Sequence, residues 1–258
     1  MALIHFDFTP ETVKVNLPLN VIVPDPGSIT GIPVAKRKVL YLLHGLSDDA
    51  SAWQRYSSIE TYARLYGLVV VMPSVNRSFY INQPNGQNYF SFLVEELPQY
   101  LKDVFGLAPK REDTLIAGIS MGGYGCFKAA LLHPEMYSAA ASFSGALSLE
   151  MWRANPTDPR IPEFTLLFGD INKLAGSEHD PAVWLKRGAQ NPKALPKLYI
   201  ACGRQDDLYP LSIGYHKACQ ALGGQSEYYE EDAKHDWLFW DGQIKRWLAM
   251  TLEPRLVQ

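Results

Sequence analysis

A serine flanked by glycines is the residue of this sequence with the clearest chemistry. The motif G-I-S-M-G at 118–122 follows a short apolar run at 114–117 and precedes a helical pattern at 123–132. A serine at a sharp turn from strand to helix has strained backbone angles, and glycines on both sides relieve the crowding. The helix that begins there also directs its backbone N–H groups at the serine. The motif alone is weak evidence, but its position predicts that Ser120 is a nucleophile.

A histidine must take the proton of this serine, and an acid must hold that histidine in one tautomer. When the serine follows a strand of a parallel sheet, the chain order is nucleophile, acid, histidine. His235 fits this order, because it follows a strand-like run at 226–229 and precedes a helical pattern at 236–252. The other histidines lie too early in the chain, in a long insertion or in a predicted helix (His5, His44, His133, His179, His216). We therefore predict His235 as the general base.

The acid is expected in the loop after the apolar run 198–201, because catalytic groups gather beyond the carboxyl ends of parallel strands. Two adjacent aspartates in this loop compete for the role. We favour Asp206, and expect Asp207 to cap the following helix or to face solvent. Asp236 is next to His235 in sequence and points away from it in most backbone conformations. We assign Asp236 to the N-cap of the last helix.

The negative charge that forms on an attacked carbonyl needs positioned donors, each worth about 10²–10³ in rate. One donor is expected to be the backbone N–H of Met121, directly after the nucleophile. The other is expected from the loop H-G-L-S at 44–47, where Gly45 lets the backbone approach a substrate closely. We predict Leu46 as that donor and assign His44 a structural role in the loop.

Two hydrophobic patterns predict the elements that position these residues. Residues 3–8 and 13–23 alternate between polar and apolar, which is typical of half-buried antiparallel strands. Later runs are wholly apolar, as in a parallel sheet covered on both faces (39–43, 68–72, 115–117, 139–143, 198–201). Helical spacing separates these runs (53–66, 89–105, 122–132, 211–222, 236–252). The sequence thus predicts an α/β fold with a mostly parallel twisted sheet, helices on both faces and antiparallel N-terminal strands.

One interval is too long for a plain crossover between strands. Residues 146–195 contain five prolines, with a sixth at Pro196 directly after them. We predict a lid or cap insertion there, and a structural excursion of short helices is the alternative. Four aromatic residues of the interval belong either to an acyl pocket or to the core (Trp152, Phe164, Phe168, Trp184). No linker divides the chain, so residues 1–258 are expected to form a single domain.

The composition excludes several classes of function. The 258 residues carry a net charge of −3, with 47% hydrophobic and 20% charged residues. This balance gives no electrostatic reason to expect nucleic acid or a membrane as partner. The sequence contains no zinc-protease, Walker-type or dinucleotide-binding motif. We predict no metal and no cofactor.

The three cysteines cannot form a closed set of disulfides, which favours a reducing compartment. The first residues lack a basic start followed by an apolar stretch, so no signal peptide is expected. A cytoplasmic location is the resulting prediction. A mechanism through Cys202 is conceivable, but a buried apolar role fits its place at the end of a strand better.

Five ordered motifs together resemble the esterase D family of α/β-hydrolases, and within it the bacterial tributyrin esterases. They are L-L-H-G-L at 42–46, G-I-S-M-G-G-Y-G at 118–125, L-F-G-D at 167–170, C-G through L-Y at 202–209 and H-D-W at 235–237. The resemblance implies a serine carboxylesterase acting on short-chain acyl esters through an acyl-enzyme, with Ser120, Asp206 and His235 as the triad.

The same resemblance offers alternatives. S-formylglutathione hydrolases of the family usually carry a cysteine shortly after the H-G-L loop, where this chain reads S-D-D-A-S-A-W at 47–53. A thioesterase of that type and an acyltransferase that passes the acyl group to a sugar remain as alternatives. A non-catalytic binding protein would have no need to keep all three triad residues. A small-molecule acyl ester is the expected partner, and a homo-oligomer is possible.

Overall fold

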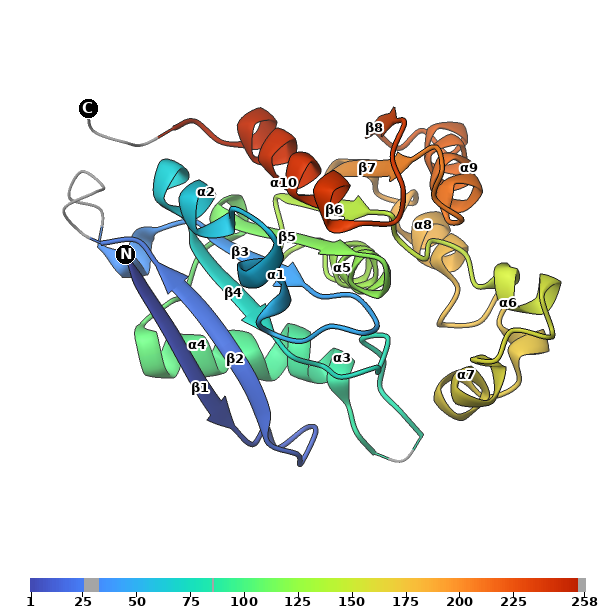
Figure 1. Cartoon of the computed structure of the whole chain (residues 1–258), viewed down its shortest axis with the longest axis horizontal. Coiled ribbons are helices and arrows are strands. Elements are labelled where there is room, and N and C mark those ends of the chain that lie inside the picture. The colour runs from blue at the N-terminus through green and yellow to red at the C-terminus, as the bar shows by residue number, and fades with distance from the viewer. Residues whose placement is uncertain (26–32, 85, 255–258) are drawn as a thin grey trace.

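The computed structural model describes residues 1–25, 33–84 and 86–254, and a single sheet runs through them (Figure 1). Eight strands within these residues pair in the order β1-β2-β4-β3-β5-β6-β7-β8. Both pairings of β2 are antiparallel, and every pairing from β4 to β8 is parallel. The strands are β1 (Ala2–Phe8), β2 (Leu17–Val23), β3 (Val39–Leu43), β4 (Val69–Pro73), β5 (Thr114–Ile119), β6 (Ala139–Phe143), β7 (Lys197–Gly203) and β8 (Ser226–Glu231). The predicted fold class is confirmed.

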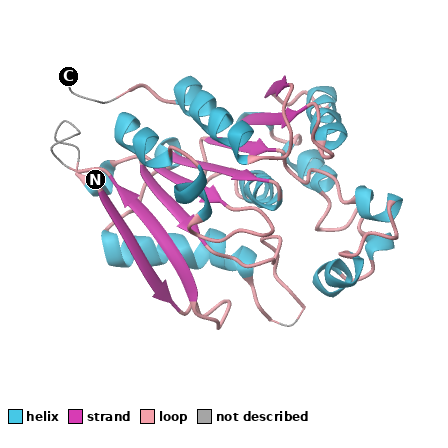
Figure 2. Cartoon of the chain, in the orientation of Figure 1, coloured by secondary structure: helices cyan, strands magenta, loops and turns pink. Residues whose placement is uncertain are grey.

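Helices cover both faces of the sheet because the inner strands are apolar on both sides (Figure 2). In β3, Val39, Tyr41 and Leu43 belong to one core, and Leu40 and Leu42 belong to the other. The second core is closed by α1 (Ala52–Tyr56), α2 (Ile59–Tyr66) and α10 (Trp237–Thr251). The first core is closed by α3 (Tyr89–Ser91), α4 (Leu97–Phe105), α5 (Met121–Leu132), α8 (Pro181–Gly188) and α9 (Tyr209–Ala221).

Most predicted elements agree with the structure to within one or two residues at each end, and two differ by more. The second strand begins at Leu17, because residues 11–13 form a turn that the carboxylate of Glu96 holds by accepting the N–H groups of Glu11 and Thr12. The predicted helix 53–66 is two helices, α1 and α2, separated at Ser57, whose backbone is extended. The apolar spacing continues across this break, which is why the sequence pattern did not reveal it.

The interval 146–195 contains two different parts. Helix α8 packs on α5 within the helical layer, with the rings of Trp184 and Tyr124 4.8 Å apart. It therefore serves as the crossover helix between β6 and β7. Helices α6 (Glu150–Ala154) and α7 (Ile161–Phe168) lie to the right of the sheet in Figure 1, away from its other helices. We call residues 146–180 the cap.

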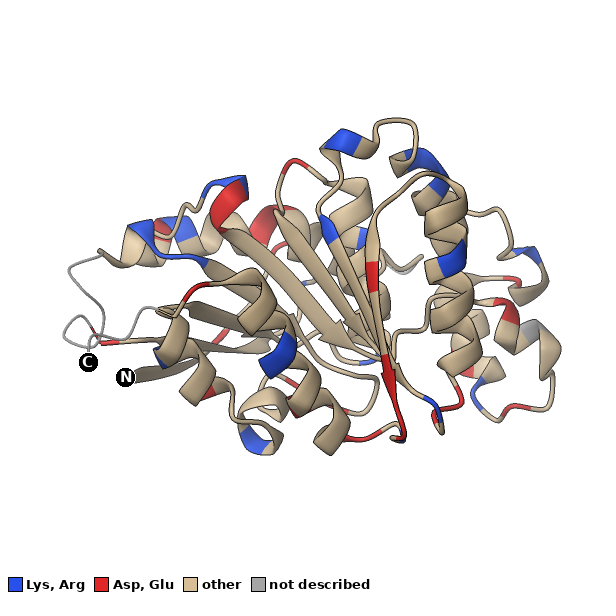
Figure 3. Ribbon diagram, turned by 90° about the horizontal axis from the view of Figure 1, so that it is seen from above, with Lys and Arg blue, Asp and Glu red and all other residues tan. Residues whose placement is uncertain are grey.

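Charged residues of both signs are spread over the helices and loops, whereas the central strands carry few of them (Figure 3). Within the described ranges no helix has the length and apolar character needed to cross a membrane.

Candidate active site

Ser120 lies at a tight turn between β5 and α5. Its backbone has φ 53° and ψ −115°, and its N–H donates to the carbonyl of Phe143 at 3.0 Å. A Cβ at Gly118 would lie 2.4 Å from the backbone of Gly122, and one at Gly122 would lie 2.5 Å from the carbonyl oxygen of Leu43. Both glycines are therefore required by close backbone packing, which is the physical basis of the motif spacing.

His235 and Asp206 meet beyond the carboxyl ends of β8 and β7. Nδ1 of His235 lies 2.8 Å from Oδ2 of Asp206, and the backbone N–H of Leu208 donates to Oδ1 of the same carboxylate at 2.8 Å. The Asp206 side chain is 1% exposed and that of His235 is 37% exposed. Burial opposes ionisation of Asp206, but the hydrogen bond and charge of His235 and further bonds from Leu208 and Ser144 outweigh it. The pKa of Asp206 is lowered from its usual value as a result.

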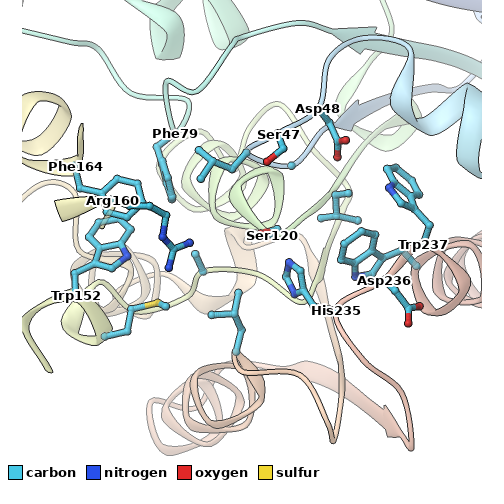
Figure 4. A pocket seen from close by; sticks show the side chains of 17 residues that line it. Ser47, Asp48, Phe79, Ser120, Trp152, Arg160, Phe164, His235, Asp236 and Trp237 are labelled. Carbon is cyan, nitrogen blue, oxygen red and sulfur yellow. The ribbon is translucent and has the colours of Figure 1, made fainter. Parts of the chain in front are cut away.

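A cavity of about 480 Å³ contains both Ser120 and His235 in its lining (Figure 4). Asp206 is not part of the lining, and its buried side chain is hydrogen-bonded to His235. Residues of the loops after β3 and β4, of the cap and of the start of α10 complete the walls, among them Leu46, Phe79, Trp152, Phe164 and Trp237. The structure therefore brings Ser120, His235 and Leu46 together around one space, with Asp206 hydrogen-bonded to the histidine.

The loop after β3, residues 44–47, is held by the ring of His44. Nε2 of His44 accepts the N–H of Val75 at 3.0 Å, so the proton lies on Nδ1, which donates to the carbonyl of Gly45 at 2.7 Å. Burial lowers the pKa of His44 to about 4. In the described part of the chain, neither the N–H of Leu46 nor that of Met121 has a hydrogen-bond acceptor. We call residues 44–47, which the sequence predicts to supply an oxyanion donor, the oxyanion loop.

The buried ring of His44 predicts a loss of stability in acid. Its pKa is about 4 in the folded protein against 6.5 when unfolded, so the unfolded chain binds more protons between these values. The free energy of unfolding therefore falls as pH drops from 6.5 towards 4, by about 3 kcal/mol in total from this group. We expect His44→Asn to be less stable than the native chain near neutral pH and to lose less stability on acidification. Urea unfolding at a series of pH values measures both effects.

The control for this prediction is His133→Asn, since His133 is half-exposed beside Glu135. That variant should keep the native decline with falling pH. An equal decline in His44→Asn and in the native chain would show that His44 is not the group responsible.

Several residues singled out in the sequence lie outside the cavity. Asp207 is exposed. Asp236, in contrast, lines the cavity, and it also caps α10 by accepting the N–H of Phe239 at 3.1 Å, as predicted. Burial raises the pKa of Cys202 to about 12, which leaves it a thiol. Of the four aromatic residues in the interval 146–195, Trp152 and Phe164 line the cavity, and Phe168 and Trp184 do not.

Ser144 is a residue that the sequence reasoning missed. Its φ of 49° places it in the left-handed region directly after β6. Its hydroxyl accepts the indole N–H of Trp240 at 3.0 Å and is a hydrogen-bond partner of Asp206. The Trp240 ring in turn stands edge-on to His235, with centroids 4.9 Å apart. The available signal is that Ser144 directly follows the carboxyl end of β6, where catalytic groups gather in parallel sheets.

Comparison with known proteins shows which family the chain is part of. Residues 12–250 match the protein family described as "Putative esterase". An acetyl esterase of Caldicellulosiruptor saccharolyticus is 30% identical, over 95% of this chain and 96% of its own. The solved structure of FphF, a fluorophosphonate-binding serine hydrolase of Staphylococcus aureus, has a TM-score of 0.88 at 32% identity, covering 98% of each chain. The S-formylglutathione hydrolase FrmB of Staphylococcus aureus has a TM-score of 0.86 at 32% identity, covering 98% of this chain and 99% of its own.

These likenesses extend over nearly the whole chain and agree in class. They confirm the α/β-hydrolase fold and the resemblance to the esterase D family, whose S-formylglutathione hydrolases are represented among the similar structures. The chain belongs to the putative esterase family and is a carboxylic ester hydrolase.

Proposed function

We propose that this enzyme is a serine carboxylesterase that hydrolyses short-chain acyl esters through an acyl-enzyme. Ser120 is the nucleophile, His235 the general base and Asp206 the acid that orients it. The observation that carries the proposal is the 2.8 Å hydrogen bond between Nδ1 of His235 and Oδ2 of Asp206, at a cavity that Ser120 also lines.

The carboxylate of Asp206 accepts a hydrogen bond from the N–H at Nδ1 of His235. Because the proton is on Nδ1, Nε2 is free to take another proton. Oγ of Ser120 attacks the ester carbonyl carbon while Nε2 takes its proton. The N–H groups of Leu46 and Met121 hold the charge that forms on the carbonyl oxygen. His235 then protonates the departing alcohol, and the acyl group stays on Ser120. Water attacks this acyl-enzyme with His235 again taking and returning a proton, which releases the carboxylic acid and restores the serine.

The cap side of the cavity supports a preference for short acyl chains. Trp152 and Phe164 stack at 4.0 Å, and both side chains are almost fully buried. The ring of Phe79 stands edge-on to each of them at 5.4 Å. Three packed rings make a wall that moves little, so an acyl chain pointing at it has limited length.

Met151, which lines the cavity beside this wall, is expected to set the acyl length. Replacing it by alanine lengthens the apolar space by several heavy atoms, and one methylene in such a pocket is worth about 10-fold or more. We expect Met151→Ala to raise kcat/KM for p-nitrophenyl octanoate relative to the butyrate about tenfold. Initial rates with the two esters measure the ratio.

Met250→Ala is the matched control, because Met250 is an exposed methionine on α10. Its octanoate-to-butyrate ratio should equal that of the native enzyme. An unchanged ratio in Met151→Ala would place the acyl chain elsewhere in the cavity.

A panel of p-nitrophenyl esters, from acetate to decanoate, tests the proposal as a whole. We expect a burst of p-nitrophenol close to the enzyme concentration, because the acyl-enzyme accumulates before water releases it. The value of kcat/KM should be greatest for acetate or butyrate. An added alcohol acceptor separates hydrolysis from acyl transfer, and turnover of none of these esters would contradict the proposal.

Thioester hydrolysis is the second candidate. The likeness to FrmB supports it, and so does Arg160, the cation among the described residues that line the cavity. A guanidinium there would suit the carboxylates of a glutathione leaving group. Against it, the stretch after the oxyanion loop lacks the cysteine of such enzymes. A kcat/KM for S-formylglutathione well above that for p-nitrophenyl acetate would favour this candidate.

We also propose that the chain works as one catalytic domain in the cytoplasm. The residues assigned to catalysis follow four different strands of one sheet, namely β3, β5, β7 and β8. The three cysteines are free and buried, which suits a reducing compartment. The cap, residues 146–180, is the part of this domain to which we assign substrate selection.

A further inference from the structure

The loop after β4, residues 75–81, contacts the oxyanion loop at three points. The N–H of Val75 donates to the ring of His44, and the hydroxyl of Tyr80 donates to the His44 carbonyl at 3.1 Å. Nη1 of Arg77 donates to the carbonyl of Leu46 over a longer 3.5 Å. The conformation of the oxyanion loop therefore depends on the position of the 75–81 loop.

The same loop also holds the cap. Nε and Nη2 of Arg77 bind the two carboxylate oxygens of Glu163 in α7 at 2.5 and 2.6 Å. Two parallel bonds of this kind fix the guanidinium in orientation as well as in distance. Two residues later, the ring of Phe79 packs edge-on against Trp152 and Phe164 of the cap. Arg77 thus contacts the cap with one edge of its guanidinium and Leu46 with the other.

Glu163 also interacts through charge with a second arginine of the cap, Arg160. Nε and Nη2 of Arg160 are bound by the carboxylate of Asp158 at 2.9 and 2.6 Å. Arg160 therefore forms its hydrogen-bonded ion pair with Asp158, and Arg77 forms its own with Glu163.

We propose that Arg77 is a positioning residue that couples the cap to the oxyanion loop. Glu163 orients the guanidinium, and the guanidinium restrains the carbonyl of Leu46, the residue assigned above as an oxyanion donor. This inference rests on the proposed function. A closed cap aligns the Leu46 N–H for the transition state, and a displaced cap releases it.

The coupling predicts an effect on turnover more than on folding or substrate binding. The side chains of Arg77 and Glu163 are 46% and 33% exposed, and ion pairs with that much exposure contribute little to stability. Loss of an entire oxyanion donor costs about 10²–10³ in kcat, and misalignment of one costs less. We expect Arg77→Met to lower kcat for p-nitrophenyl acetate about tenfold with KM within about twofold of the native value.

The charge-reversed double variant, Arg77→Glu with Glu163→Arg, tests the route of the coupling. It restores an ion pair between the 75–81 loop and the cap. However, it places a carboxylate beside the Leu46 carbonyl, and a carboxylate has no N–H group to donate to that oxygen. We expect kcat to stay as low as in Arg77→Met. Recovery of kcat to the native value would show that the pair only holds the cap, and would overturn the proposal.

Lys38→Met is the matched control, because Lys38 forms another partly exposed ion pair, with Asp113, at the amino-terminal ends of β3 and β5, far from their carboxyl ends where the proposed site lies. Its kcat should equal that of the native enzyme. The proposal is also overturned if Arg77→Met keeps native kcat, or raises KM alone, while the native enzyme is active. An inactive native enzyme would instead contradict the proposed function, so the two failures are distinguishable.

Discussion

Replacing Ser120 by alanine is expected to lower kcat for p-nitrophenyl acetate by about 10⁶, to the rate that the remaining donors and binding contacts supply. The hydroxyl is the group that becomes acylated, so no neighbour replaces it once it is removed. The turn tolerates the substitution, because alanine adds no atom to a backbone already set at φ 53° and ψ −115°. The folded state should therefore remain, which circular dichroism and the thermal midpoint would confirm.

A serine-directed phosphonate followed by peptide mass mapping identifies the nucleophile directly. The label should appear on the peptide that contains Ser120 and should be absent from Ser120→Ala. Ser47→Ala is the matched variant, since Ser47 is another hydroxyl in the cavity lining, and it should keep the label on Ser120. A label that persists in Ser120→Ala, or that moves with Ser47, would contradict the assignment.

The strands were predictable where one physical cause dominates. Runs such as 39–43 and 139–143 are buried at every position and almost wholly apolar because helices cover both faces, and the observed strands have those same bounds. Each proposed catalytic residue then follows from the order of strands along the chain. In contrast, the turn at 11–13 depends on Glu96, a residue more than eighty positions away. The local pattern of polar and apolar residues cannot predict such a distant contact.

The cap shows where prediction from sequence stops. Proline and aromatic residues mark the interval 146–195 as unusual, but they do not say which rings face the cavity. Trp184 is packed on α5 with the crossover helix, whereas Trp152 faces the cavity. The contribution of Arg77 is likewise set by tertiary contacts, since Glu163 lies in a different element. Such roles depend on how α7 packs, which no spacing rule determines.

The choice between two adjacent aspartates follows from burial and hydrogen bonding together. Oδ2 of Asp206 binds Nδ1 of His235, while its Oδ1 accepts the N–H of Leu208. The hydroxyl of Ser144 is the third hydrogen-bond partner. Together the three donors keep the buried carboxylate ionised and fix its orientation, which agrees with its lowered pKa. Asp207 is exposed to solvent. A substitution that keeps the shape and removes the charge should therefore affect the two positions very differently.

Asp206→Asn is expected to lower kcat by about 10⁴, by analogy with loss of the triad acid in other serine hydrolases. The amide places an N–H where His235 needs an acceptor, which favours the tautomer with the proton on Nε2. Ser120 then faces a ring nitrogen that cannot take its proton. Steady-state rates with p-nitrophenyl acetate measure the loss, and the shape-preserving change should leave the cavity and KM nearly as they were.

Asp207→Asn is the matched control, because it makes the same chemical change one residue away on an exposed side chain. It should retain kcat within about twofold, since a solvent-exposed substitution away from any contact has little effect. Comparable losses at both positions would mean that the net charge of the loop, rather than the bond to His235, supports catalysis. A loss confined to Asp206 requires the acid to act through that one ring nitrogen, because the two variants carry equal charge.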